Sequence, residues 1–334
     1  MLEILPSHLS ERIRIVGEKS QIKNSGPVVV WLKSSHRFHE NPAIDVGRIL
    51  AYENNLPLLV YHGIDERYPY SSLRHHNSLL DAAVDVSRLC AKNGIRHALH
   101  LAREGHRPSV MKEFAKSASL IITDLFPIPP WDKWVRKVSE ISECPVLEID
   151  CHCVIPMPLY GKSVDRPFKF RSATKKLRKE RIQREWPAVT VTPSEYSGEL
   201  PFTPIEIESE VADMVSRFNL LKKCNIDPTV LPVWNEKGGE EAALKKWGKF
   251  LEKGLSGYAR RRNNAADAEG VSKLSSAFHY GFLSPMKVAR DASAVGTKSA
   301  DKYLDELLIF REHAWHHIYS SENPYSESNL PGWA

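Results

Sequence analysis

The chain has 334 residues, of which 42% are hydrophobic and 26% charged. This composition excludes a chain that is disordered throughout and a collagen-like repeat. At about 150 residues per domain, the length predicts two domains. The formal net charge is only +5, but residues 161–188 include ten basic and three acidic residues and net +7. The positive charge is therefore concentrated in one segment.

The cysteines and the N-terminal segment indicate the cellular compartment in which the protein is expected. Five cysteines at irregular spacing argue against a secreted disulfide scaffold. The tightest group is Cys151-His152-Cys153, which indicates a structural thiol pair because no second pair of ligands stands at metal-binding spacing. No apolar run approaches the ~18 residues of a membrane span, and residues 1–21 lack an uninterrupted apolar stretch. We expect a cytoplasmic protein without a membrane partner.

The first half of the chain alternates short apolar runs with amphipathic stretches. Strands separated by helices predict parallel pairing through right-handed crossovers, and hence a doubly wound α/β domain. The first expected strand is followed by Lys33-Ser34-Ser35 rather than by G-x-G-x-x-G, which argues against a dinucleotide-dependent dehydrogenase. The expected strands are 28–32, 58–61, 95–101, 120–124 and 146–150, and the expected helices are 43–54, 72–93, 109–118 and 131–141.

The pattern changes after residue 154. Frequent prolines between 155 and 204 indicate a long connection, with one basic helix expected over 172–185. Helical periodicity then dominates without strand alternation, which predicts an all-α second domain. The expected division is an α/β domain over 1–154, a connection over 155–204 and a helical domain over 205–334. The helices expected there are 208–223, 239–255, 276–280, 285–294 and 300–319.

Two polar clusters in the second half could carry chemistry. Ser272, Lys273 and Ser275 form a hydroxyl-rich turn that enters a helix, an arrangement that can hold a phosphate. An ordinary serine N-cap explains the same residues. Further on, Glu306 and Phe310 stand four apart on one helical face, where a carboxylate and a ring could hold a flat polar ligand. An amphipathic helix with solvated charges is the alternative.

The order of these pieces resembles the photolyase/cryptochrome family, and is closest to the class II cyclobutane pyrimidine dimer photolyases. The likeness extends over most of the chain, in the order in which the family carries these motifs. The segments that carry it are Trp31 to Arg37 with Asn41-Pro42-Ala43, Arg74-His75-His76, Ile149 to Pro156, Tyr258 with Arg262-Asn263-Asn264, Ser272 to Ser275 with His279-Tyr280-Gly281, and Glu306 to Glu312.

The resemblance implies a flavin enzyme that repairs UV-damaged DNA. Reduced FAD, excited by light, would pass an electron to a pyrimidine dimer flipped out of the duplex. Glu306 would bond to the bases of the dimer and Phe310 would stack on the lesion. The positions implied for FAD binding are Tyr258, Val271, Ser272, Lys273, Leu274, Ser275 and Arg311. The protein would act as a monomer.

DNA-backbone contacts are expected from basic side chains. The candidates are Lys175, Lys176, Arg178, Lys179, Arg260, Arg261 and Arg262. For the first four, a solvated helix face explains the charges equally well.

The sequence also departs from the family. Asn264-Ala265 replaces the favoured Asp-Pro, Ser276 stands where the family favours Pro, and Phe310 stands where photolyases often carry Trp. Family members continue through further helices that complete the flavin pocket. We therefore expect an incomplete, truncated FAD-binding domain that retains little flavin and repairs poorly.

Two alternative readings compete with repair. One is a photolyase-like DNA-binding or light-sensing protein without repair activity. The other is a nucleotide-binding α/β protein of the universal-stress or electron-transfer-flavoprotein type with an unrelated helical tail.

Overall fold

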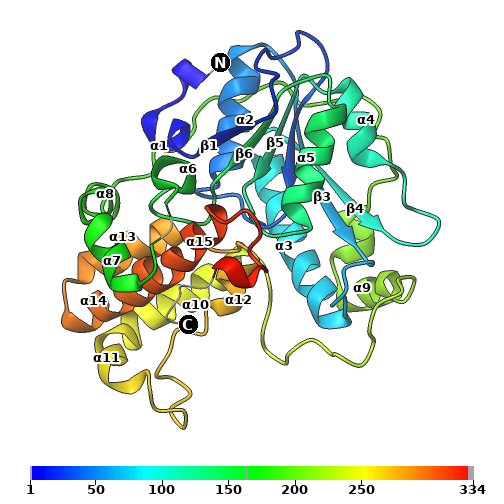
Figure 1. The fold of residues 1–334 in the computed structure, drawn as a ribbon. Helices are drawn as coiled ribbons and strands as arrows, with labels where there is room; N and C mark the ends of the chain where they lie inside the picture. Colours follow the sequence, from blue (N-terminus) through cyan, green and yellow to red (C-terminus); the bar gives the residue numbers. More distant parts are fainter. Residues whose placement is uncertain (1, 163, 330–334) are drawn as a thin grey trace.

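The computed structural model describes residues 2–162 and 164–329, and its first half is built on a six-stranded sheet (Figure 1). The strand order is β1-β6-β5-β2-β3-β4. Five strands run parallel, with β2 in the middle between β5 and β3. Residues 330–334, the end of the expected helical domain, lie outside the described residues. The strands are β1 (Ile13–Val16), β2 (Val28–Leu32), β3 (Leu58–Asp65), β4 (Arg96–Ala102), β5 (Leu120–Asp124) and β6 (Val146–Ile149).

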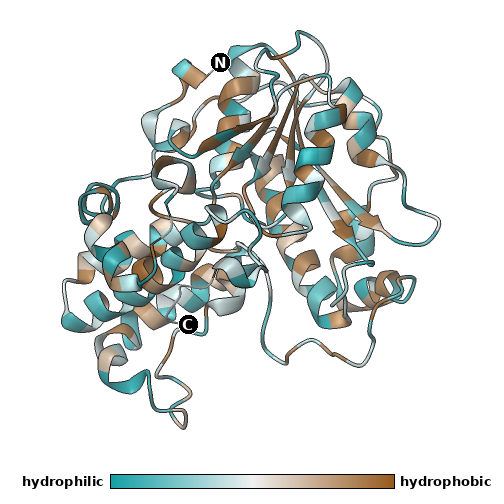
Figure 2. Ribbon diagram, in the orientation of Figure 1, coloured by the Kyte–Doolittle hydropathy of each residue, from teal (hydrophilic) through white to brown (hydrophobic). Residues whose placement is uncertain are grey.

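Helices cover both faces of this sheet because the central strands are apolar on both sides. All five residues of β2 are buried, and the central strands are hydrophobic along their length (Figure 2). Val28 and Val30 pack toward one pair of helices, while Val29 and Trp31 pack toward the other pair. The expected doubly wound α/β fold is confirmed. The first pair is α2 (Pro42–Glu53) and α3 (Leu73–Lys92), and the second is α4 (Val110–Ser117) and α5 (Trp131–Ile141).

The sheet has one strand more than the periodicity indicated. β1 pairs antiparallel with β6 at the edge of the sheet. Three of its four residues are partly buried and Ile15 is exposed, so it lacks the buried apolar run that marked the other strands. A short helix α1 (Ser7–Ser10) and a 3-10 turn η1 (Leu2–Ile4) precede it. The expectation of an all-parallel set of five strands was therefore incomplete.

The connection after β6 contains two short basic helices where one was expected. Helix α6 (Met157–Tyr160) is followed by α7 (Pro167–Ala173) and α8 (Lys175–Arg181). The break falls at Thr174, whose hydroxyl bonds to the Phe170 carbonyl at 2.7 Å. A threonine hydroxyl that bonds back by four residues bends a helix. The expected continuous helix over 172–185 was wrong for this reason.

The second half of the described chain is helical, as expected. The stretch expected as one helix over 208–223 is interrupted, because Asp213 accepts hydrogen bonds from Val215 N and Ser216 N and begins a new helix. The elements are the π-helix η2 (Ile207–Val211), α9 (Met214–Leu221), α10 (Glu240–Lys253), η3 (Leu255–Gly257), α11 (Tyr258–Arg261), α12 (Ser275–His279), α13 (Pro285–Val295), α14 (Lys298–Asp305), the π-helix η4 (Glu306–Arg311), α15 (Glu312–Tyr319) and η5 (Glu327–Asn329).

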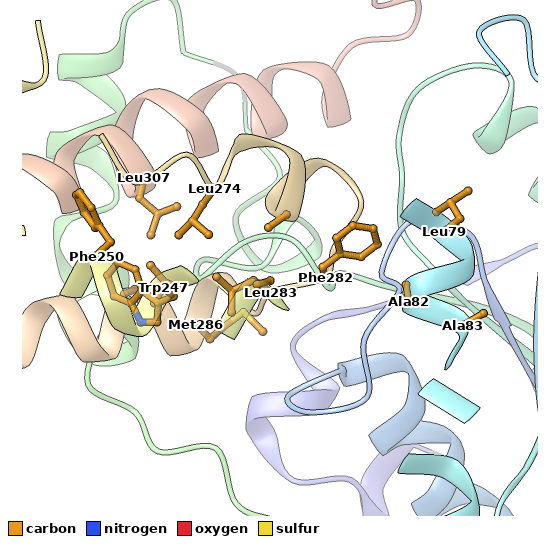
Figure 3. Packing of buried hydrophobic residues seen from close by; sticks show 14 of the residues in the cluster. Leu79, Ala82, Ala83, Trp247, Phe250, Leu274, Phe282, Leu283, Met286 and Leu307 are labelled. Carbon is orange, nitrogen blue, oxygen red and sulfur yellow. The ribbon is translucent and has the colours of Figure 1, made fainter. Parts of the chain in front are cut away.

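One apolar cluster joins the helices of the second half to the sheet half. Leu79, Ala82 and Ala83 of α3 belong to the same buried cluster as Trp247 and Phe250 of α10. Figure 3 shows Phe282 between α3 and the remaining helical side chains. Because burial of apolar surface contributes about 25 cal/mol per Å2, this shared cluster holds the helices against the α/β half and fixes where the site residues lie.

Candidate functional site

Tyr258 and Ser272 are brought together by Tyr303 of α14. The rings of Tyr258 and Tyr303 meet edge-on, with 5.1 Å between centroids. The Tyr303 hydroxyl donates to Ser272 Oγ at 3.3 Å, and its ring stacks on Trp247. Burial raises the pKa of Tyr258, which keeps its hydroxyl protonated and able to donate. Tyr303 carried no signal in the sequence beyond its place on an apolar helix face.

The turn that leads into α12 holds Ser272 half-buried, and Ser275, the first residue of the helix, is exposed to solvent. Leu274 is buried and anchors the segment, whereas Ser275 and Val271 are exposed. Lys273 adopts a left-handed φ of 54° and pairs with Glu269 at 3.1 Å. Because α12 has only five residues, its dipole is small. Any phosphate here would depend on hydroxyl and backbone N–H donors rather than on a long helix.

Glu306 and Phe310 lie on the π-helix η4, between α14 and α15. One oxygen of the Glu306 carboxylate, Oε1, accepts from Arg262 at 3.0 Å and from Lys302 at 2.8 Å. Lys302 Nζ also lies 5.6 Å from the centroid of the Phe310 ring, which is 46% exposed. The carboxylate of Glu306 and the ring of Phe310 therefore lie on the same side of η4, next to Lys302. A π-helix inside an α-helical stretch is frequent at functional sites.

Arg311 ties this helix to the α/β half. Its guanidinium donates to the His152 carbonyl at 2.7 Å and lies over the rings of Phe278 and Trp315, at 5.4 and 5.6 Å from their centroids. Trp315 stacks on the His152 ring at 4.7 Å. Burial lowers the pKa of His152 to about 3, so this ring is neutral beside the Arg311 cation.

The expected DNA-contacting residues fall into two groups. Lys175, Lys176 and Lys179 are exposed on α8, whereas Arg178 is held by Thr174 Oγ1 and the Arg171 carbonyl. On the second group, Arg260 is exposed, Arg261 pairs with Asp267 at 2.6 Å and Arg262 pairs with Glu306. Only the second group adjoins Glu306.

The residues present fit one wall of a site for a phosphate-bearing aromatic cofactor. The exposed hydroxyl of Ser275 and the half-buried hydroxyl of Ser272 are donors that suit phosphates, and the guanidinium of Arg311 presents a flat cation. None of the four principal cavities in the described residues is lined by Tyr258, Ser272, Glu306 or Arg311. Residues 2–162 and 164–329 contain no group of His, Cys, Asp and Glu side chains that could hold a metal ion.

Comparison with known proteins finds relatives that share one name and match nearly the whole chain. No model of a protein family matches the sequence. A deoxyribodipyrimidine photo-lyase from Methanothermobacter thermautotrophicus is 26% identical over 326 residues, which are 97% of this chain and 68% of that protein. A second one, from Oryza sativa, is 26% identical over 329 residues, which cover 93% of this chain and 62% of the relative. The chain therefore spans about two thirds of the length of these relatives.

Solved structures agree with the sequence matches. A bacterial class III photolyase from Agrobacterium tumefaciens superimposes with a TM-score of 0.61 at 16% identity, over 90% of this chain and 60% of that one. An archaeal photolyase from Sulfolobus tokodaii, described with two FAD molecules, gives 0.59 at 15% identity, over 88% of this chain and 59% of that one. Among the described residues, no helix is long and apolar enough to cross a membrane. Along nearly its whole length, the chain is therefore similar in sequence to deoxyribodipyrimidine photo-lyases, and it shares the fold of solved photolyases.

Proposed function

We propose that the protein repairs cyclobutane pyrimidine dimers in DNA by light-driven electron transfer from reduced FAD, as a monomer related to the class II enzymes. The observation that carries this proposal is the match along nearly the whole chain to deoxyribodipyrimidine photo-lyases. The position of Glu306, Phe310 and Arg311 on one π-helix supports it. The residues that contact them include Arg262 directly after α11, Phe278 of α12 and Lys302 of α14.

The flavin, when bound, supplies light-driven donation and recovery of a single electron. The chain's own residues bind and orient it. Ser272 and Ser275 offer hydroxyl donors to its phosphates, and Tyr258 supports Ser272 through Tyr303. Arg311 is held in one orientation by the His152 carbonyl, so its charge is fixed at the edge of this wall before any ligand arrives.

The carboxylate and ring on η4 suit a pyrimidine dimer that is flipped out of the duplex. Glu306 can accept hydrogen bonds from base N–H groups, and Phe310 offers a ring face for stacking. The ion pairs of Glu306 with Arg262 and Lys302 are partly exposed, and such pairs contribute only about 0–1 kcal/mol. A ligand can therefore displace them at little cost. They also keep the carboxylate on the side to which Phe310 opens.

The decisive experiment measures flavin content and repair on the same preparation. The ratio of bound flavin to protein is read from absorbance, and the preparation is then mixed with an oligonucleotide that contains one thymine dimer, in blue light and in the dark. Light-dependent loss of the dimer supports the proposal. Stoichiometric flavin without repair supports a light-sensing protein, and binding of damaged DNA without flavin supports a DNA-binding protein.

A further inference from the structure

Helix α7 of the connection lies beside the π-helix that carries Glu306 and Phe310. Phe170 of α7 is fully buried, and its ring contacts those of His313 and His316 of α15. Arg171 pairs with Asp305, the residue before η4, at 2.5 Å. These contacts fix which face of α7 is turned to solvent, and Figure 1 shows α7 beside the helices of the second half.

Phe168 occupies that outer face. Residues two apart on a helix point in nearly opposite directions, so burial of Phe170 turns Phe168 outward. Its ring is 55% exposed, and it shares a face with Arg171, three residues on. Arg171 is bonded to Asp305, and Lys302 connects Asp305 to the ring of Phe310, which is also exposed. A series of charged contacts therefore runs from the face of α7 that carries Phe168 to Phe310.

Cations are interleaved with these two rings. Lys302 links Asp305, Glu306 and the Phe310 ring. Five cations and three carboxylates give the surface a net charge of +2, and all of its ion pairs are at least partly exposed. Its charged members are Arg166, Lys169, Arg171, Arg262 and Lys302 with Asp165, Asp305 and Glu306.

Exposed rings alternating with cations are the arrangement by which proteins hold unpaired nucleotides, through base stacking and phosphate contacts. We propose that Phe168 is a second base-stacking residue, which holds an unpaired DNA base next to the one that Phe310 receives. This inference rests on the proposed function for the identity of the partner as DNA. The residue lies in the connection, outside every segment that the sequence motifs marked.

The test is binding of a fluorescein-labelled single strand of about 16 thymidines, followed by anisotropy at several salt concentrations. Phe168→Leu keeps an apolar side chain but removes the ring. We expect its Kd to rise about tenfold, since stacking is worth about 1–3 kcal/mol per base. The slope of log Kd against log salt should stay unchanged, because no phosphate contact is lost. Phe168→Trp should restore the affinity.

Phe218→Leu is the matched control. Phe218 is 48% exposed on α9, with Lys222 Nζ 4.4 Å from its centroid, so it also combines a ring with a cation. We expect this variant to bind like the unmodified protein. Equal Kd values for Phe168→Leu and the unmodified protein, or equal weakening in both leucine variants, would overturn the inference. Absence of any DNA binding by the unmodified protein would instead refute the proposed partner.

Discussion

Glu312 predicts a specific pH dependence of stability. Its side chain is fully buried at the start of α15 and accepts hydrogen bonds from Val154 N at 2.6 Å and Ile155 N at 3.2 Å. Burial raises the pKa of Glu312 from 4.5 to about 8, although both backbone bonds and Arg311 oppose the shift. The folded chain thus binds this proton more tightly than the unfolded chain does. The stabilisation is present below about pH 4.5 and is lost as the pH rises through 8.

The magnitude follows from linkage. At 1.36 kcal/mol per pKa unit, the full shift corresponds to about 5 kcal/mol, of which roughly 2 kcal/mol falls between pH 6 and pH 8. Buried histidines also make the free energy of unfolding depend on pH, because burial lowers the pKa of His36 to about 4 and that of His75 to about 3. The comparison must therefore be made against a variant that differs only at position 312.

Glu312→Gln is that variant, because glutamine is neutral at every pH. Urea unfolding, followed by tryptophan fluorescence, gives the free energy of unfolding of both proteins at each pH. Loss of one acceptor adds a constant cost of about 1–3 kcal/mol to the variant. We expect the difference between the two proteins to change by roughly 2 kcal/mol from pH 6 to pH 8, in favour of glutamine at the higher pH. A difference that is the same at both pH values would refute the reasoning.

Three further predictions concern the proposed function. Glu306→Gln should lower light-dependent repair at an unchanged flavin-to-protein ratio, whereas a parallel loss of flavin would make Glu306 structural. Arg311→Ala leaves the His152 carbonyl without its charged donor, and should lower the free energy of unfolding in urea by about 1–3 kcal/mol; an unchanged value would contradict this. DNA affinity should fall steeply with salt, and each phosphate-contacting lysine that is removed should reduce the slope by about 1; an unchanged slope would leave α8 as a solvated face. The substitutions for that test are Lys175→Ala, Lys176→Ala and Lys179→Ala.

Periodicity predicted the elements whose burial is regular and missed those where a side chain changes the backbone. The strands at 28–32 and 120–124 and the helix at 131–141 have the expected bounds, since each buries a continuous or amphipathic apolar face. The breaks at Thr174 and Asp213 come from single side-chain hydrogen bonds to the backbone. Such bonds leave the apolar pattern almost unchanged and are therefore hard to see in a sequence.

The sequence marked residues of the candidate site, but it did not indicate which side chains contact one another. The motif order marked Tyr258, Ser272 and Glu306. Their connections run through Lys302 and Tyr303, which look like a helix surface charge and a core residue in the sequence. The widening of the helix into a π-turn at 306–311 was also invisible, because the residues on either side keep helical spacing. These contacts and the π-turn are determined by packing in the folded chain, which the sequence pattern does not show.

The α/β half has a direct part in placing the candidate site. The loop Asp150–Ile155 follows β6, and its backbone carbonyls accept hydrogen bonds from side chains of distant segments, namely Arg12, Arg37, Arg311 and His316. Glu312 accepts from two N–H groups of the same loop. A backbone with its polar groups satisfied from both halves cannot shift without breaking several buried bonds, each worth about 0.5–3 kcal/mol. Because Arg311 is bonded to this loop and is the last residue of η4, the end of the parallel sheet sets the position of the wall that we assign to the flavin.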